Sequence, residues 1–291
     1  MRFILTADWH IRATMPRCRK DENWMETQRK ILSQIRKISS DKKVPIIVVG
    51  DIFHSNTDTS FECIQIVQEI GELYVLAGNH DLPYHNSENL NKSAIGVLLN
   101  SNDVHLIKDY FEKLHYEYNE NYDYSAKNFD EEDNKFAEYV FKHTLTLPEK
   151  NSMIESETPE SLVKKFPKAK WIFTGDYHKA FSVKIGDCHV INPGCIIRQV
   201  SDFKNYQCGV YYIDTEKEEV EFIPIIDDKE MVDDSYITIQ NEREERIDNF
   251  VSKLKESKSL TLNFVENVEN AILENKINDE LKDMIYELLE V

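Results

Sequence analysis

The stretch Pro45-Ile46-Ile47-Val48-Val49-Gly50-Asp51-Ile52-Phe53-His54 decides the fold of this chain. Its first half is an apolar, mainly β-branched run without polar alternation, which is typical of a strand covered on both faces. Gly50 then permits a tight turn, and Asp51 follows it at the strand end. The stretch therefore predicts a buried strand that brings a carboxylate to the edge of an α/β sheet.

Similar elements surround this stretch along the chain. Apolar runs that predict strands occur at residues 2–7, 73–76, 138–142 and 171–174, and apolar residues at helical spacing occur at 24–38, 60–70 and 159–166. Residues 181–226 are strand-rich, and a short strand at 236–239 with charged helices at 243–256 and 279–290 follows. We expect a large α/β domain over residues 1–230 and a small α+β domain over residues 231–291.

The composition limits the kind of protein. Of 291 residues, 41% are hydrophobic, which is ample for a large core. No apolar run approaches the roughly 18 residues that a membrane-spanning helix needs, so we expect no membrane association. The five cysteines form no C-x-x-C pair, and we expect reduced thiols in a cytoplasmic protein, or in the host cytoplasm if a phage encodes it.

The charge is strongly acidic, with 53 acidic and 35 basic residues and a net charge of −18. Such a chain repels polyanions, which argues against a free-standing DNA-binding protein but not against a nuclease that holds phosphate through metal ions. Residues 117–138 contain eight acidic residues and two lysines. We interpret them as a solvated insertion, with docking of a partner as the alternative.

Polar side chains that can bind metal follow most of the predicted strands. They form the clusters Asp8-Trp9-His10, Gly50-Asp51, Gly78-Asn79-His80-Asp81, His143 and Gly175-Asp176-Tyr177-His178. In extended chain, residues two apart project to the same side, so Asp8 and His10 can hold one ion, and Asp176 and His178 have the same spacing. Alone, each cluster has a simpler interpretation, such as a turn, a helix N-cap or a strand-end histidine.

Counting ligands favours a two-metal site. One ion would be held by Asp8, His10, Asp51 and His178, and the other by Asp51, Asn79, His143 and Asp176. Four protein ligands for each ion leave room for water. His80 is adjacent to Asn79 and cannot easily serve the same ion, so we expect it to reach the substrate, with Asp81 orienting its ring through a hydrogen bond.

Taken together and in this order, the clusters resemble the calcineurin-like metallophosphoesterases over residues 1–200. Gly50-Asp51-Ile52-Phe53-His54 is similar to the nuclease subunits of SbcD type, and so is Asn192-Pro193-Gly194 followed by Arg198-Gln199. The resemblance implies a β-sandwich flanked by helices, with a DNA-capping domain at the C-terminus. It also implies two divalent ions, Mn²⁺ above all and Mg²⁺ as a possibility, and a substrate contact for His54.

The resemblance further implies a role. It suggests a DNA exonuclease or endonuclease in repair or recombination, an ABC-type ATPase partner of SbcC type, and a homodimer. A phosphatase or a small-substrate phosphodiesterase with the same metals is the alternative, and a non-catalytic scaffold is a more distant one. The chain has no G-x-x-x-x-G-K-[ST] loop, so ATP use would require the partner.

One residue departs from the family pattern. Asp176 stands where the family's G-H-x-H motif has a histidine. A carboxylate is a harder, anionic ligand, so this change should favour Mn²⁺ or Mg²⁺ over Zn²⁺ at the second position.

Overall fold

The computed structural model describes residues 1–101, 103–107, 137–151 and 153–233, and parts of 235–288. The chain divides into two compact units, Met1–Asp233 and Asp234–Val291. The strand expected at 236–239, most of the helix expected at 243–256 and residues 117–136 of the acidic segment lie outside the described residues. That the second unit caps DNA stays a prediction.

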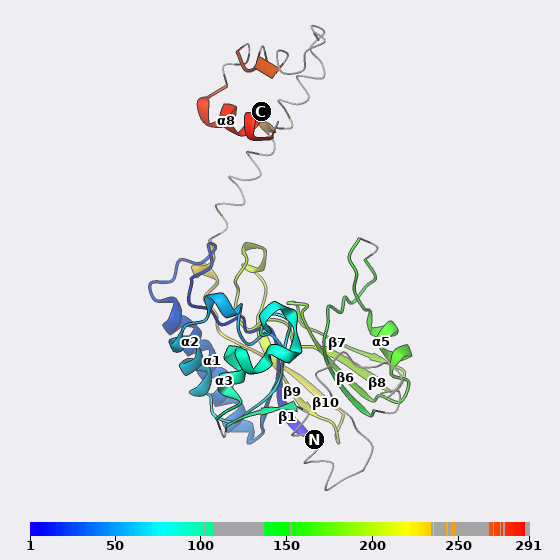
Figure 1. The fold of residues 1–291 in the computed structure, drawn as a ribbon. Coiled ribbons are helices and arrows are strands. Elements are labelled where there is room, and N and C mark those ends of the chain that lie inside the picture. Colours follow the sequence, from blue (N-terminus) through cyan, green and yellow to red (C-terminus); the bar gives the residue numbers. More distant parts are fainter. Residues whose placement is uncertain are drawn as a thin grey trace. The chain divides into compact units, whose positions relative to one another are not determined.

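Two sheets form the first unit (Figure 1). The larger sheet has the order β10 (Glu219–Pro224), β9 (Gly209–Asp214), β1 (Arg2–Thr6), β2 (Ile46–Val49), β3 (Leu73–Leu76) and β4 (Val104–Leu106). Strands β1 to β4 are parallel, whereas β9 and β10 are antiparallel. The smaller sheet has the order β5 (Tyr139–His143), β6 (Trp171–Gly175), β8 (Cys188–Asn192) and β7 (Phe181–Ile185), of which β7 is antiparallel.

Helices cover the outer faces of both sheets (Figure 1). The larger sheet carries α1 (Trp24–Lys42), α2 (Phe61–Gln68) and α3 (Ala94–Leu98), and the smaller sheet carries α5 (Pro159–Lys165). Short 3₁₀ turns lie at Asn56–Asp58, Pro83–His85, Ser87–Lys92, Ser201–Phe203 and Lys229–Met231. In the second unit, α8 (Asp279–Leu288) contributes Ile285 to a small apolar cluster with Val268 and Ile272.

The alternation of side chains along each strand explains these layers. In β1, Phe3 and Leu5 are buried between the two sheets, whereas Ile4 packs with the helices. Ile47 and Val49 of β2 face the smaller sheet in the same way. Burial on both faces is why the strand residues contain no polar alternation, and it confirms the expected sandwich flanked by helices.

Two further findings concern the chemistry of the chain. All five cysteines are buried and free. Among the described residues, no helix is both long enough and apolar enough to span a bilayer.

Candidate metal centre

The predicted ligands meet at one edge of the sandwich because parallel strands end there. Asp8, Asp51 and Asn79 follow the carboxyl ends of β1, β2 and β3. From the facing sheet, His143 is the last residue of β5 and Asp176 follows β6. Carboxyl ends of neighbouring parallel strands form a common edge, so residues from five strands and two sheets converge.

The first group of ligands gathers around His10. Its ring nitrogen Nε2 lies 3.0 Å from Nε2 of His178 and 3.7 Å from Oδ2 of Asp51. Asp8, His10 and His178 place one ligand atom each within 4.8 Å of one another. These positions match the set expected to hold one ion.

The second group gathers around His143. Its Nε2 lies 3.2 Å from Oδ2 of Asp51, 3.0 Å from Oδ1 of Asn79 and 3.9 Å from Oδ1 of Asp176. Asp51 therefore stands between the two groups, where its carboxylate can reach both. The distances place all seven expected metal ligands together, and their role in binding metal stays a prediction.

Backbone strain accompanies this convergence. Asp8, His10, Asp51 and Asp176 have φ angles of 51°, 45°, 55° and 74°. Residues with a side chain avoid this left-handed region, at a cost of about 1–2 kcal/mol each. Such strain persists where surrounding structure enforces it, and it is concentrated at functional sites. Here the left-handed conformation changes the direction of the chain just after each strand, at the residue that carries the carboxylate or imidazole.

Two glycines leave room for the His143 ring. Gly50 has a φ of 85°, and a Cβ there would overlap the ring, because the backbone passes directly beside it. A Cβ at Gly175 would lie 3.1 Å from Cε1 of the same ring and closer still to its Nδ1. The ring is thus enclosed by two strand ends that cannot carry a side chain.

The tautomer of His143 suits a metal ligand. Its Nδ1 lies 2.8 Å from the carbonyl oxygen of Val49. A carbonyl only accepts, so Nδ1 carries the proton and the lone pair of neutral His143 is on Nε2, facing Asp51 and Asn79. No sequence pattern pointed to this contact, since any residue at position 49 supplies a carbonyl.

Two buried carboxylate oxygens have no hydrogen bond from any described residue, namely Oδ2 of Asp8 and Oδ2 of Asp51. Nε2 of His143 lies 3.2 Å from Oδ2 of Asp51 and pairs with it only when the imidazole is protonated. An unsatisfied buried carboxylate oxygen is costly unless a cation is nearby. The oxygens therefore fit a bound divalent ion.

The pKa values record the same crowding of charge. Burial raises the pKa of Asp8 to about 7, with Asp51 adding to the rise and His143 opposing it. Burial alone would lower the pKa of His143, but the Asp51 and Asp8 carboxylates outweigh it and raise this pKa to about 10. In the absence of metal, protons thus stabilise the group, and cation binding would release them.

The three remaining candidate residues lie beside the first group. Rings of His10, His54 and His80 place one nitrogen each within 4.8 Å of one another. The ring nitrogen Nδ1 of His80 donates to the carbonyl oxygen of His54 over 2.6 Å. This leaves Nε2 of His80 as the nitrogen available to a substrate.

The expected hydrogen bond from His80 to Asp81 is absent, and this part of the prediction was wrong. The Asp81 carboxylate instead accepts backbone N–H bonds from Ile52, Phe53 and Gly78, at 3.2, 2.8 and 2.9 Å. Asp81 is 2% exposed. It therefore ties together the two loops that carry Asp51 and Asn79, because those backbone groups point inward after the strand ends.

The sequence contains a family signature over most of this unit. A profile of the calcineurin-like phosphoesterases matches residues 1–180. No curated protein sequence matches the chain.

The solved structures to which the chain is similar are distant. An archaeal phosphodiesterase is 16% identical, with a TM-score of 0.38, and the match covers 77% of this chain and 100% of that one. A putative 5'-nucleotidase from Staphylococcus aureus is 14% identical (TM-score 0.45; 78% and 54% covered). The nuclease MPE of Pseudomonas putida is 12% identical (TM-score 0.31; 65% and 73% covered). These values say nothing about the substrate, and the family rests on the profile match: this chain belongs to the calcineurin-like phosphoesterases.

Proposed function

We propose that this protein is a two-metal phosphodiesterase that hydrolyses DNA. The observation that carries the two-metal site is the pair of buried oxygens on Asp8 and Asp51 without a hydrogen bond, surrounded by imidazoles from both sheets. Asp8, His10, Asp51 and His178 would hold one ion, and Asp51, Asn79, His143 and Asp176 the other. The ligand set, rich in carboxylate and amide oxygen, favours Mn²⁺ and is compatible with Mg²⁺.

Two ions at this position would lower the pKa of water and neutralise negative charge on the phosphate. The chain itself supplies the proton for the leaving oxygen. The Nδ1–H group of His80 donates to the carbonyl oxygen of His54 and keeps its proton. The proton that His80 gives to the leaving oxygen is therefore the one on Nε2 of the imidazolium form. The ring of His54, stacked on His80 at 5.6 Å, supports a contact with the same phosphate.

DNA is proposed as the substrate on the strength of the resemblance to SbcD-type nucleases around His54. The same resemblance supports an SbcC-type ABC ATPase as partner, a homodimer, and a capping role for the second unit. The net charge of −18 opposes tight DNA binding by this chain alone, and a partner subunit would supply the DNA-binding surface.

A second candidate function is a phosphatase or a small-substrate phosphodiesterase. The acidic charge favours it, because a small ester needs no extended basic surface.

Metal content and substrate preference test both proposals. The purified chain should contain or take up two Mn²⁺ ions, and dialysis against EDTA should abolish hydrolysis, which Mn²⁺ then restores. Activity that persists without metal contradicts the mechanism. Digestion of linear duplex DNA with Mn²⁺, compared with single-stranded DNA and p-nitrophenyl phosphate, separates the nuclease from the small-substrate enzyme. Asp8→Asn should lose activity, whereas Asp187→Asn, in an exposed turn, should not.

A further inference from the structure

Gln199 connects the loop that carries His10 to a distant part of the chain. Its side-chain Nε2 donates to the backbone carbonyls of Trp9 and His10, over 3.2 and 3.0 Å. The two carbonyls lie on the loop where Asp8 and His10 adopt φ angles of 51° and 45°. Contacts with other segments hold a strained loop in its conformation. The N–H groups of Asp8 and His10 donate to the carbonyls of Gly50 and Asp51 on one side, and the two bonds from Gln199 fix the carbonyls of the loop on the other.

The residue before Gln199 is fixed on both sides of its backbone. The N–H of Arg198 donates to Oδ2 of Asp227 over 3.0 Å, and its carbonyl accepts from Nη1 of Arg19 over 3.2 Å. The guanidinium Nε of Arg198 also donates to the carbonyl of Tyr206, over 2.8 Å. Gln199 therefore extends from an anchored peptide.

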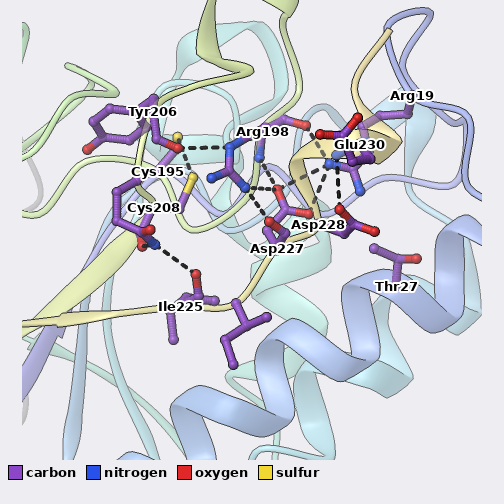
Figure 2. A network of polar contacts seen from close by, with 12 residues as sticks. Arg19, Thr27, Cys195, Arg198, Tyr206, Cys208, Ile225, Asp227, Asp228 and Glu230 are labelled. Carbon is purple, nitrogen blue, oxygen red and sulfur yellow. Dashed lines mark hydrogen bonds and ion pairs between the residues drawn. The ribbon is translucent and has the colours of Figure 1, made fainter.

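The anchor is a buried group of four charged side chains, and Figure 2 labels Arg19, Arg198 and Asp227 among them. The Asp227 carboxylate pairs with Arg19 at 3.0 Å and with Arg198 at 3.2 Å, and Arg19 pairs with Asp21 at 2.7 Å. The Arg19 and Asp227 side chains are both 0% exposed. Two positive and two negative charges balance, and losing one would leave a buried charge unpaired. Breaking the arrangement is therefore costly.

The same region binds the last residues of the first unit. The N–H of Asp233 donates to the carbonyl of Cys18 over 2.6 Å, and the N–H of Lys20 donates to the carbonyl of Met231 over 3.0 Å. The Ser201 hydroxyl donates to the carbonyl of Asp233 over 3.0 Å. Three segments, around residues 18–20, 198–201 and 227–233, are thus held together behind the His10 loop.

We propose that Gln199 is a positioning residue for the metal ligand His10, and that the Arg19–Asp227–Arg198 group holds Gln199 in place. The inference rests on the proposed function, because it assumes a metal ion at His10. A glutamine amide suits the task, since its two N–H groups can serve two carbonyls. Contacts behind a metal ligand commonly change metal affinity 10- to 100-fold when they are lost.

Gln199→Met tests the proposal, because methionine has a similar shape and donates no hydrogen bond. The matched control is Gln207→Met, since Gln207 also donates to two backbone carbonyls, those of Cys208 and Ile225, at 2.9 and 3.0 Å. Mn²⁺ affinity of the full chain is measured by electron paramagnetic resonance of the free ion. Gln199→Met should bind one of the two Mn²⁺ ions, the one at His10, about 10-fold more weakly, and Gln207→Met should bind both as the unmodified protein does.

Amide hydrogen exchange of the metal-free proteins gives a second readout. Exchange at residues 8–12 should be faster in Gln199→Met than in the unmodified protein and in Gln207→Met. If the unmodified protein binds no Mn²⁺, the proposed function fails, and exchange alone then decides whether Gln199 positions this loop. Unchanged Mn²⁺ affinity together with unchanged exchange in Gln199→Met would overturn the inference.

Discussion

Nδ1 of His80 lies 2.6 Å from the backbone carbonyl oxygen of His54, and this contact determines which ring nitrogen faces the site. The carbonyl can only accept, so the proton on Nδ1 is fixed and Nε2 is left for chemistry. His54 thus orients His80 through its backbone, while its own ring stacks on that of His80. A backbone contact would survive substitution at position 54, so the two histidines can be tested separately.

His80→Ala should lower kcat about 100- to 1,000-fold for DNA, because the leaving alkoxide then lacks a positioned acid. The loss should be much smaller for bis-p-nitrophenyl phosphate, since p-nitrophenolate leaves without a proton. The measurement is kcat for both substrates with Mn²⁺. His105→Ala is the control, because His105 lies on the edge strand β4, where its ring stacks on Tyr74, and it is not one of the candidate site residues. Equal losses on both substrates would contradict an acid role for His80.

Asp81→Asn should destabilise the fold by about 2–3 kcal/mol and lower activity as well. Replacing a carboxylate oxygen by an NH₂ group leaves buried N–H donors without an acceptor. Those donors belong to the loops around Asp51 and Asn79, so the ligands should shift. Urea unfolding and kcat measure the two effects.

Asp214→Asn provides the comparison for Asp81. Asp214 is equally buried at 2% exposure and accepts N–H bonds from Glu216 and Lys217. It lies at the end of β9 and approaches none of the candidate ligands, so its substitution should cost stability and leave kcat unchanged. If Asp81→Asn lowers kcat without loss of stability, Asp81 acts directly on the reaction.

The Asp81 result illustrates what the sequence could predict. Runs such as Ile46–Val49 show where buried strands end, and parallel strand ends must share an edge, so the meeting of Asp8, Asp51 and Asn79 was predictable. The partner of a buried carboxylate was not, because Asp81 binds backbone groups that every residue has. Arg19 and Asp227 are 208 residues apart, and no local pattern pairs them. The pairing order of the strands was likewise beyond a reading of periodicity.

Asp176→His should retain activity and shift metal preference from Mn²⁺ toward Zn²⁺ at the second position. Imidazole is a softer, neutral ligand than carboxylate, and Oδ1 of Asp176 already lies 3.9 Å from Nε2 of His143. Bound Mn²⁺ and Zn²⁺ per chain are measured in competition. Asp176→Ala, which removes the ligand, should instead lose about one of two ions. An inactive Asp176→His protein with normal metal content would exclude a ligand role.

Lowering the pH should weaken the buried ion-pair group of Arg19, Asp21, Arg198 and Asp227, because Asp21 becomes protonated and loses its charge. Burial alone would raise the pKa of Asp21, but hydrogen bonds and charge from Arg19 outweigh it and hold this pKa below its ordinary value of 3.8. The folded state therefore favours the carboxylate, and this stabilisation is present above about pH 4 and is lost as the pH falls through the folded-state pKa.

In urea unfolding between pH 5 and pH 2.5, Asp21→Asn should reduce the loss of unfolding free energy that the unmodified protein shows. Asp187→Asn, which removes an exposed carboxylate in the turn between β7 and β8, should leave that loss unchanged. If Asp21→Asn and the unmodified protein lose stability in parallel over this range, Asp21 does not contribute to the anchor as a charged group.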